Sequence, residues 1–213
     1  MITAASNSRI KRLVQLNQKS KLRRTEDVFL AEGVKMFLEA PREQLQEVYV
    51  SESFLEKCSC REHLEEVGYE VVSDSVFSKI SDTCTPQGVL CVLKQFHYNI
   101  EEMLRDKAPL FLLLENIQDP GNLGTMLRTG EGAGVSGIIM SRDTVDLYNP
   151  KVIRSTMGSI YRVPFYYADD FASAVHQVQQ AGVSVYAAHL RGKNSYACQD
   201  YTKGTAFLIG NEG

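Results

Sequence analysis

The chain has 213 residues, of which 44% are hydrophobic and 23% charged, with a formal net charge of −3 at neutral pH. These proportions are ordinary for a globular protein and allow one large domain or two small ones. No apolar run is long enough to span a membrane, and the polar, basic N-terminus lacks the apolar core of a secretory signal. We therefore expect a cytoplasmic protein.

The first 25 residues combine cations with apolar residues at helical spacing. They contain no acid and seven cations: Arg9, Lys11, Arg12, Lys19, Lys21, Arg23 and Arg24. The segment 7–18 predicts a helix with an apolar face, and Ser6 is its expected N-cap. Such a helix can pack one side and offer the other to phosphates, and we expect all seven cations to contact nucleic acid. The simpler alternative is a solvated helix face.

The next seventy residues alternate helix and strand patterns. Strands are predicted at 28–31, 46–51, 70–72 and 88–93, and helices at 33–40, 52–67 and 76–81. The pattern predicts a small α/β sandwich over residues 1–95 with a core of its own. The polar segment 96–108 is the expected linker.

From residue 109 to 213 the alternation becomes strict. Strands are predicted at 110–115, 137–141, 163–166, 184–188 and 206–209, with helices at 122–133, 149–155 and 171–180 between them. This rhythm is typical of a mostly parallel sheet covered by helices.

The segment 116–128 is the most informative stretch of the chain. It follows an apolar strand, passes through a loop containing Pro120, and opens a helix carrying Asn122 and Arg128. At 100° per residue these two side chains lie loosely on one side of that helix. An amide beside a permanently charged guanidinium favours binding of an anionic substrate, although a plain helix N-terminus with a surface arginine would have the same letters.

Two later segments complete a set of motifs. Asn149-Pro and Arg154-Ser precede a Gly-Ser pair at 158–159, and the strand at 206–209 runs into Gly210-Asn-Glu-Gly. With 116–128, these motifs resemble the SpoU-type branch of the SPOUT superfamily, the trefoil-knotted RNA ribose 2′-O-methyltransferases. The resemblance implies S-adenosylmethionine as methyl donor, RNA as partner, a homodimer and no metal.

The resemblance also assigns residues. Asn122, Arg128 and Glu212 match the family's signature amide, arginine and acid, which implies a catalytic role for each. Gly210 matches a donor-contact glycine, and the same site is expected to include Ala188, His189 and Leu208. Arg154 is expected either at an RNA phosphate or at the dimer interface.

Chemistry limits two of these roles. An arginine is a poor general base because its pKa lies above about 12. Arg128 is therefore expected to clamp phosphate and stabilise the developing oxyanion. His189 could act as a base, but a histidine at a strand end is more often structural.

The N-terminal region carries a second, weaker resemblance. Glu32-Gly33 after one strand and the segment 85–88 before another resemble the substrate-binding domain that often precedes SpoU domains. That domain is similar to ribosomal RNA-binding proteins, which favours ribosomal over transfer RNA. The alternative is a packing module without a binding role.

Two other patterns are rejected. Gly132-Ala-Gly134-Val-Ser-Gly137 has the letters of a dinucleotide fingerprint, but a helix precedes it and a strand follows, the reverse of what a pyrophosphate site needs. It predicts a helix C-cap instead. The five cysteines lack paired ligand spacing, so we expect reduced thiols and no zinc site.

The sequence stops at Gly213, whereas family members continue for some tens of residues and close the knot with that tail. We expect a shortened chain here. The alternative function is an RNA-binding or ribosome-assembly protein that kept the fold and lost catalysis.

Overall fold

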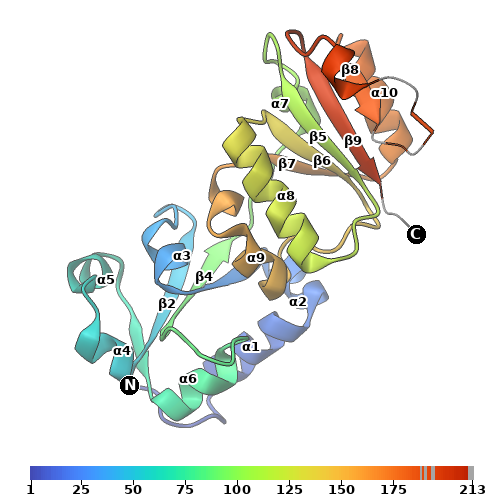
Figure 1. Ribbon diagram of the computed structural model, residues 1–213. Helices are drawn as coiled ribbons and strands as arrows, with labels where there is room; N and C mark the ends of the chain where they lie inside the picture. The colour runs from blue at the N-terminus through green and yellow to red at the C-terminus, as the bar shows by residue number, and fades with distance from the viewer. Residues whose placement is uncertain (188, 190, 193–194, 211–213) are drawn as a thin grey trace. The chain divides into compact units, whose positions relative to one another are not determined.

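A computed structural model describes residues 1–187, 189, 191–192 and 195–210. The chain forms two compact units (Figure 1). The first contains Met1–Phe96 and Asp146–Tyr161, and the second contains His97–Val145 and Arg162–Gly213. The chain thus returns to its first unit once before completing the second. Residues 146–161 pack in the first unit although they follow much of the second unit in the chain. The predicted domain division at 1–95 and 109–213 remains a prediction.

The first unit is built on a mixed four-stranded sheet with the order β1-β4-β2-β3. Its strands are β1 (Val28–Glu32), β2 (Leu45–Ser51), β3 (Glu70–Val72) and β4 (Val89–Lys94). β4 pairs antiparallel with both β1 and β2, and β2 pairs parallel with β3. The order leaves β1 and β3 as the two edges.

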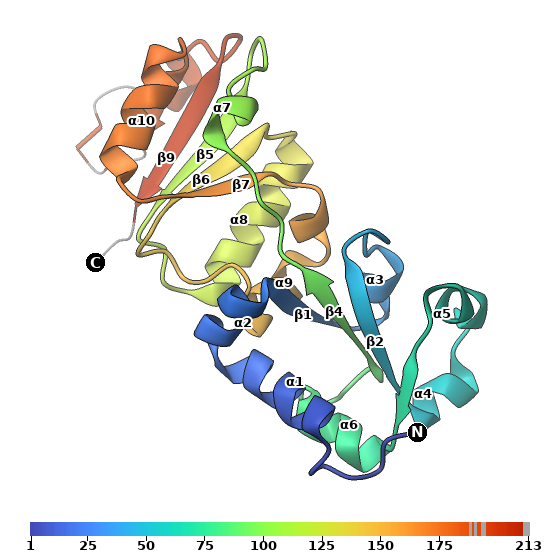
Figure 2. The same cartoon turned by 180° about the vertical axis from the view of Figure 1, so that it is seen from behind.

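Helices cover this sheet and its edges. They are α1 (Ser8–Gln18), α2 (Ser20–Glu26), α3 (Val34–Leu38), α4 (Glu52–Lys57), α5 (Arg61–Val67), α6 (Asp74–Ile80) and α9 (Pro150–Thr156), with a 3₁₀ turn η1 (Ser159–Tyr161). α1 and α6 lie side by side (Figure 2). Leu13 and Phe77 from these helices are fully buried against the sheet residues Leu30, Tyr49 and Leu90. The predicted apolar face of the first helix is therefore confirmed.

The returning segment 146–161 packs along the edge strand β1. The ring of Tyr148 lies 4.9 Å from that of Phe29, and its hydroxyl donates to the Phe96 carbonyl at 3.0 Å. Tyr161 donates its hydroxyl to the Met36 carbonyl at 3.0 Å. These buried aromatics hold α9, and Arg154 on it, in the first unit.

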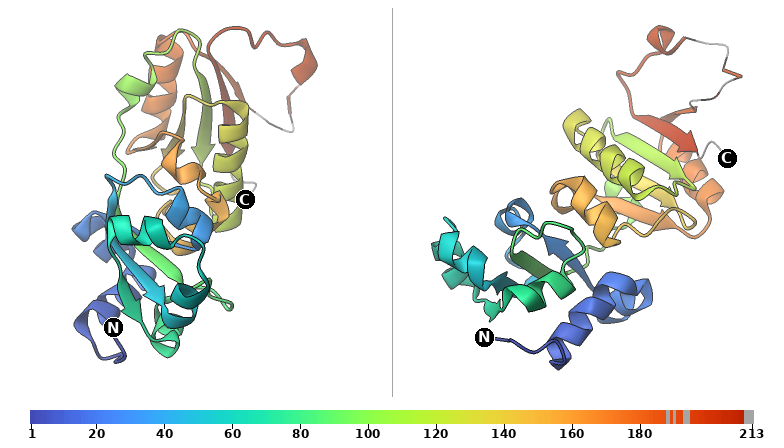
Figure 3. Two further views of the ribbon diagram at one scale, coloured as in Figure 1. Left: turned by 90° about the vertical axis from the view of Figure 1, so that its left-hand side faces the viewer. Right: turned by 60° about the horizontal axis from the view of Figure 1, so that its bottom comes forward.

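The second unit is a five-stranded, fully parallel sheet with the order β7-β6-β5-β9-β8. Its strands are β5 (Leu110–Glu115), β6 (Gly137–Ser141), β7 (Phe165–Ala168), β8 (Ser184–Ala187) and β9 (Thr205–Gly210). The strand arrows all point to one edge (Figure 3). The mostly parallel α/β class predicted from the sequence is confirmed.

Helices lie on both faces of this sheet. α8 (Pro120–Ala133) covers one face, and α7 (Ile100–Met103) with α10 (Phe171–Gln180) covers the other (Figures 1 and 2). A short 3₁₀ turn, η2 (Tyr196–Cys198), precedes β9. Phe111, Leu113 and Ile139 are buried against Ile100 and Val178 on the α7 and α10 side. Within the described residues, no helix is long and apolar enough to cross a bilayer.

Three local predictions need correction. The N-cap of α1 is Asn7, not Ser6, because the Asn7 side chain accepts from the Arg9 N–H at 2.9 Å. The helix predicted over 52–67 is two short helices, since the backbone at Cys58 is extended and ends α4. The expected linker 96–108 contains α7.

Candidate active site and nucleic-acid-binding surface

The loop from β5 into α8 is set by a cap that the sequence-based prediction did not include. Asp119 is the N-cap and accepts from the Asn122 N–H at 2.7 Å, while Pro120 occupies the first helical position. Proline is favourable there because its missing N–H would have no helical partner. The signal was available in the letters Asp-Pro, which are typical of a helix start.

The same loop is anchored to the neighbouring strand. Asn116 has a left-handed backbone with φ 53°, and its N–H donates to the Ser141 hydroxyl at 2.8 Å. The Ile117 N–H donates to the Thr144 hydroxyl at 3.3 Å, so two buried hydroxyls, one at the end of β6 and one just after it, hold the loop after β5. Asparagine tolerates a left-handed backbone better than most residues. This arrangement fixes where α8 begins.

Asn122 and Arg128 are both exposed on α8. Among the described residues, neither side chain has a hydrogen bond or ion pair. A permanently charged guanidinium without an internal partner is available to a substrate anion. The two predicted catalytic residues are therefore brought onto one helix with their side chains accessible.

The predicted donor-site residues lie on neighbouring strands. Leu208 pairs with Leu113 on one side and Ala187 on the other, and Gly210 ends β9 opposite Glu115. His189 follows the end of β8, and its Nδ1 accepts from the Arg191 N–H at 3.0 Å. That bond gives the ring a local structural role. Ala188 and Glu212 lie outside the described residues, so their predicted roles remain predictions.

A cavity of about 510 Å³ opens at the carboxyl edge of the parallel sheet. Of the predicted residues, Gly210 lines it, whereas His189 and Leu208 do not. The charged side chains around it are Glu115, Arg142, Asp143, Asp169 and Asp170. Arg142 forms an ion pair with Asp169, and four carboxylates against one guanidinium leave the cavity acidic. The sequence-based prediction missed these acids because they come from three separate strand ends.

Asp170 also caps α10. Its carboxylate accepts from the Ser173 N–H at 3.0 Å and the Ser173 hydroxyl at 2.8 Å. These hydrogen bonds lower the pKa of Asp170 below its ordinary value.

The N-terminal cations divide into paired and unpaired groups. Arg9 forms an ion pair with Glu70 at 3.1 Å, and Arg12 bridges Glu26 at 2.7 Å and Glu47 at 2.8 Å. Four further cations are exposed and have no ion pair within the part of the chain that the structure describes: Lys11, Lys19, Lys21 and Arg24. Only this second group offers unpaired charge to phosphate. We call these four residues the basic surface.

Arg23 does not belong to the surface, which corrects its prediction as an RNA contact. Its side chain is 3% exposed. It donates to the Asp146 carboxylate at 2.6 Å and to the Leu16 carbonyl at 2.7 Å. The sequence cluster hid this role because Asp146 lies 123 positions away along the chain.

Arg12 is part of a polar network in the first unit. Tyr49 donates its hydroxyl to Glu47, one of the two acids that Arg12 bridges. Burial, followed by the hydrogen bond to Glu47, raises the pKa of Tyr49 well above its ordinary value. This network of hydrogen bonds and ion pairs stabilises the sheet of the first unit from within.

Arg154 is held within the first unit as well. Its guanidinium donates to the Asp82 carbonyl and carboxylate, both at 3.3 Å, and the side chain remains 46% exposed. Its predicted role at an RNA phosphate or a dimer interface is not tested by these contacts.

The glycine-rich turn fits its alternative interpretation. Gly134 is the left-handed C-cap of α8 with φ 72°, as predicted for the glycine-rich turn. All five cysteines are free, and burial raises the pKa of Cys91. No group of three or more His, Cys, Asp or Glu side chains among the described residues is placed to hold a metal.

The second unit is a parallel α/β sheet with a cavity at its carboxyl edge and with an exposed amide and guanidinium on α8. Comparison with known proteins specifies the class. Residues 109–213 match the SpoU rRNA Methylase family, and residues 7–91 match the MRM3-like substrate binding domain. The 23S rRNA (guanosine(2553)-2′-O)-methyltransferase RlmP of Bacillus subtilis (strain 168) is 32% identical over 215 residues, covering 100% of this chain and 82% of that protein.

Solved structures agree. The AdoMet-bound rRNA methyltransferase from Sinorhizobium meliloti superposes with a TM-score of 0.82 at 28% identity, over 99% of this chain and 80% of that one. The SpoU methyltransferase AviRb from Streptomyces viridochromogenes in complex with AdoMet has a TM-score of 0.85 at 22% identity, over 97% and 82% of the two chains, a likeness of fold.

The chain belongs to the SpoU rRNA methylase family. This confirms the predicted resemblance, including the substrate-binding domain that precedes the catalytic one. It also confirms the predicted enzyme class, an RNA methyltransferase with S-adenosylmethionine as methyl donor.

Proposed function

We propose that this protein transfers a methyl group from S-adenosylmethionine to a ribose 2′-hydroxyl of ribosomal RNA. The observation that carries the proposal is the placement of Arg128 and Asn122, exposed on a helix that starts at the carboxyl edge bordered by Gly210. Ligands of parallel α/β sheets bind at that edge. The 23S rRNA specificity in the name of the Bacillus subtilis relative supports ribosomal RNA as the substrate.

Arg128 holds the phosphate next to the reacting ribose and stabilises negative charge on the 2′-oxygen. The hydroxyl loses its proton as its oxygen forms the new bond to carbon, so charge develops on that oxygen. The guanidinium cannot accept the proton, which leaves to a neighbouring acceptor such as an RNA phosphate. Asn122 orients the ribose or the arginine through its amide.

The carboxyl edge of the sheet suits the methyl donor. S-adenosylmethionine supplies an electrophilic methyl group on a positively charged sulfur. The acidic lining of the edge cavity, with Glu115 and Asp143 among its carboxylates, favours a cationic centre. Glu212, Ala188, His189 and Leu208 complete the proposed site.

The basic surface binds the RNA backbone. Arg9, Arg12 and Arg154 contribute less to this binding, because each already has an acidic partner. We further propose a cytoplasmic homodimer that works without a metal ion. Attack on a sulfonium methyl group has a neutral leaving group and calls for no Lewis acid.

The experiment is transfer of labelled methyl from S-adenosylmethionine to unmodified 23S rRNA made by transcription. Alkaline hydrolysis of the product distinguishes the site, because a 2′-O-methyl group blocks cleavage and leaves the label in a dinucleotide. Label in mononucleotides would mean base methylation and would contradict the proposal. Donor binding without any transfer would favour a protein that binds RNA and has lost catalysis.

A further inference from the structure

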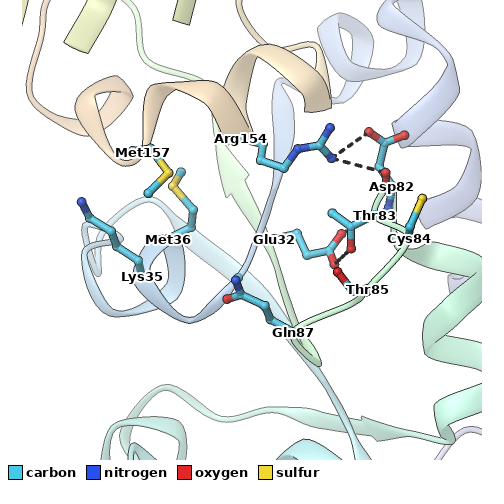
Figure 4. Close-up of a pocket in the computed structure, with 11 residues that line it drawn as sticks. Glu32, Lys35, Met36, Asp82, Thr83, Cys84, Thr85, Gln87, Arg154 and Met157 are labelled. Atoms are coloured by element: carbon cyan, nitrogen blue, oxygen red, sulfur yellow. Dashed lines mark hydrogen bonds and ion pairs between the residues drawn. The ribbon is translucent and has the colours of Figure 1, made fainter. Parts of the chain in front are cut away.

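A second cavity, of about 430 Å³, lies wholly within the first unit and apart from the carboxyl edge. It lies between the start of α3, the segment 82–87 that leads into β4, and the end of α9 (Figure 4). Its volume is within the range of small-ligand sites. We call it the Gln87 pocket.

The Gln87 amide has a fixed orientation. The Val34 N–H donates to Oε1 at 2.9 Å, so this atom must be the carbonyl oxygen and the other must be the NH₂ group. Gly33, with φ +113°, makes the approach possible, since a Cβ there would lie 3.0 Å from the same oxygen. Among the described residues, Nε2 has no hydrogen-bond acceptor. The pocket therefore has a pre-oriented donor pair at its wall (Figure 4).

The opposite wall is held rigid by Glu32. Its carboxylate accepts from the Ser81 hydroxyl at 2.7 Å, the Thr83 hydroxyl at 2.9 Å and the Asp82 N–H at 3.2 Å. Arg154 in turn donates to the Asp82 carbonyl. The segment 81–83 is thus fixed from both sides, which preserves the shape of the pocket without bound ligand.

Two methionines form the apolar side. Met36 is buried, and Met157 is 44% exposed with a left-handed backbone of φ 52° at the C-cap of α9. Both side chains line the pocket, Met36 from α3 and Met157 from the end of α9 (Figure 4). Methionine sulfur is polarisable and contacts aromatic rings favourably. Met157 therefore presents exposed apolar surface at the pocket.

The lining charges cancel. Lys35 and Arg154 are balanced by Glu32 and Asp82, so the pocket has no net attraction for phosphate. A flat, neutral ring with hydrogen-bond acceptors on its edge fits the pocket better than a phosphate group does, because the ring can lie against the thioethers and accept from the Gln87 amide.

We propose that the Gln87 pocket binds one unstacked base of the substrate RNA, through a carbonyl or ring-nitrogen acceptor on its edge. This proposal rests on the proposed function, since it assigns RNA as the ligand. Sequence-selective proteins read single-stranded RNA in this way, by stacking a base and hydrogen bonding its edge. The pocket would give the first unit a share in choosing the site of methylation.

The decisive variant is Gln87→Glu, which keeps the acceptor for the Val34 N–H and replaces the donor pair with a charged acceptor. Gln46→Glu, exposed on β2 and outside the pocket, is the charge-matched control. Met157→Ala removes one of the two methionines of the apolar side. It should leave folding intact because the side chain is partly exposed, and thermal melting checks this. The probe is a 23S rRNA transcript, with Kd measured at several salt concentrations and methyl transfer measured alongside.

We expect Gln87→Glu to weaken RNA binding about tenfold relative to Gln46→Glu, the effect of losing one good base contact. Met157→Ala should weaken it severalfold. The salt slope of Gln87→Glu should equal that of Gln46→Glu, and the slope of Met157→Ala should equal that of the wild type. Both variants should raise KM for RNA more than they lower kcat, and leave donor affinity intact. A base contact releases no counterion, so a slope that falls by about one would indicate phosphate instead and overturn the proposal.

Unchanged RNA affinity in both variants would also overturn it, while continued methylation would leave the proposed function standing. Equal weakening by Gln46→Glu would reduce the effect to charge alone and overturn it too. An inactive wild-type protein that still loses RNA affinity on Gln87→Glu would instead mean that the pocket is right and the proposed function is wrong.

Discussion

Arg23 in the first unit and Arg128 in the second have different tasks. In the first unit, Arg23 is buried against Asp146, and Arg9 and Arg12 pair with acids on the sheet, Glu70 and Glu47. In the second, Arg128 stands exposed on α8 without an ion pair among the described residues. A guanidinium already held by a carboxylate has lost much of its capacity for phosphate, whereas a free one retains it. Clustering along the sequence is therefore a poorer guide to binding than the presence or absence of an internal partner.

The largest effect should come from Asp146→Asn, which tests the structural side of this comparison. The change removes the counter-charge of a guanidinium that is only 3% exposed and cannot be neutralised. Leaving such a charge uncompensated costs about 3–5 kcal/mol of the free energy of unfolding. Denaturant unfolding followed by circular dichroism measures it.

Arg23→Met is the informative partner of that variant. It removes the buried charge itself and leaves Asp146, which is partly exposed, to be solvated. It should therefore cost less than Asp146→Asn. If the two variants cost the same, the destabilisation does not come from burying an unpaired guanidinium.

Arg128→Ala tests the functional side. Removing one preorganised donor from a developing oxyanion typically lowers kcat by about 10²–10³-fold. Thermal stability should hold, because the side chain is exposed and has no ion pair within the described chain. Methyl transfer to rRNA is the measurement, and Arg105→Ala, exposed in the same unit, is the matched control. Full activity in Arg128→Ala would contradict the proposed role of Arg128.

The basic surface offers a smaller and purely electrostatic effect. Replacing Lys11, Lys19, Lys21 and Arg24 by Ser should weaken RNA binding and flatten its salt dependence. The slope of log K against log salt should fall by about 0.7–0.9 for each phosphate that the protein no longer neutralises. Four exposed cations elsewhere in the unit serve as a charge-matched control: Arg42, Lys57, Arg61 and Lys79. An equal change in the control would mean that total charge matters and the surface does not.

The sequence predicted the order of strands and helices well, because each element of the second unit carries its own apolar period. The strand 110–115 matches β5 and the helix 171–180 matches α10 in both bounds. It also predicted the helix that carries Asn122 and Arg128, since that signal is local.

What escaped prediction depends on residues far apart in the chain. The return of 146–161 to the first unit follows from Tyr148 packing on Phe29, and no local pattern contains that contact. The fixed amide of Gln87 depends on Val34, 53 positions earlier. The acidic cavity and the burial of Arg23 likewise depend on residues that are far apart in the chain. Local patterns give elements, whereas sites arise where the ends of several elements meet.

The smallest effect concerns two surface carboxylates, one in each unit. Asp74 accepts from the Ser53 hydroxyl at 2.8 Å, and Asp170 caps α10. Hydrogen bonds to the ionised form lower the pKa of both. A carboxyl group whose pKa is lower in the folded state stabilises the protein above its ordinary pKa, about 3.9, and that contribution disappears as the pH falls through the lowered value. Asp74→Asn and Asp170→Asn should therefore reduce stability at pH 6 and reduce it progressively less at a second pH below the ordinary pKa. Denaturation midpoints at the two pH values measure the difference. A loss of stability that is equal at both values would mean that packing, and not ionisation, accounts for these two contacts.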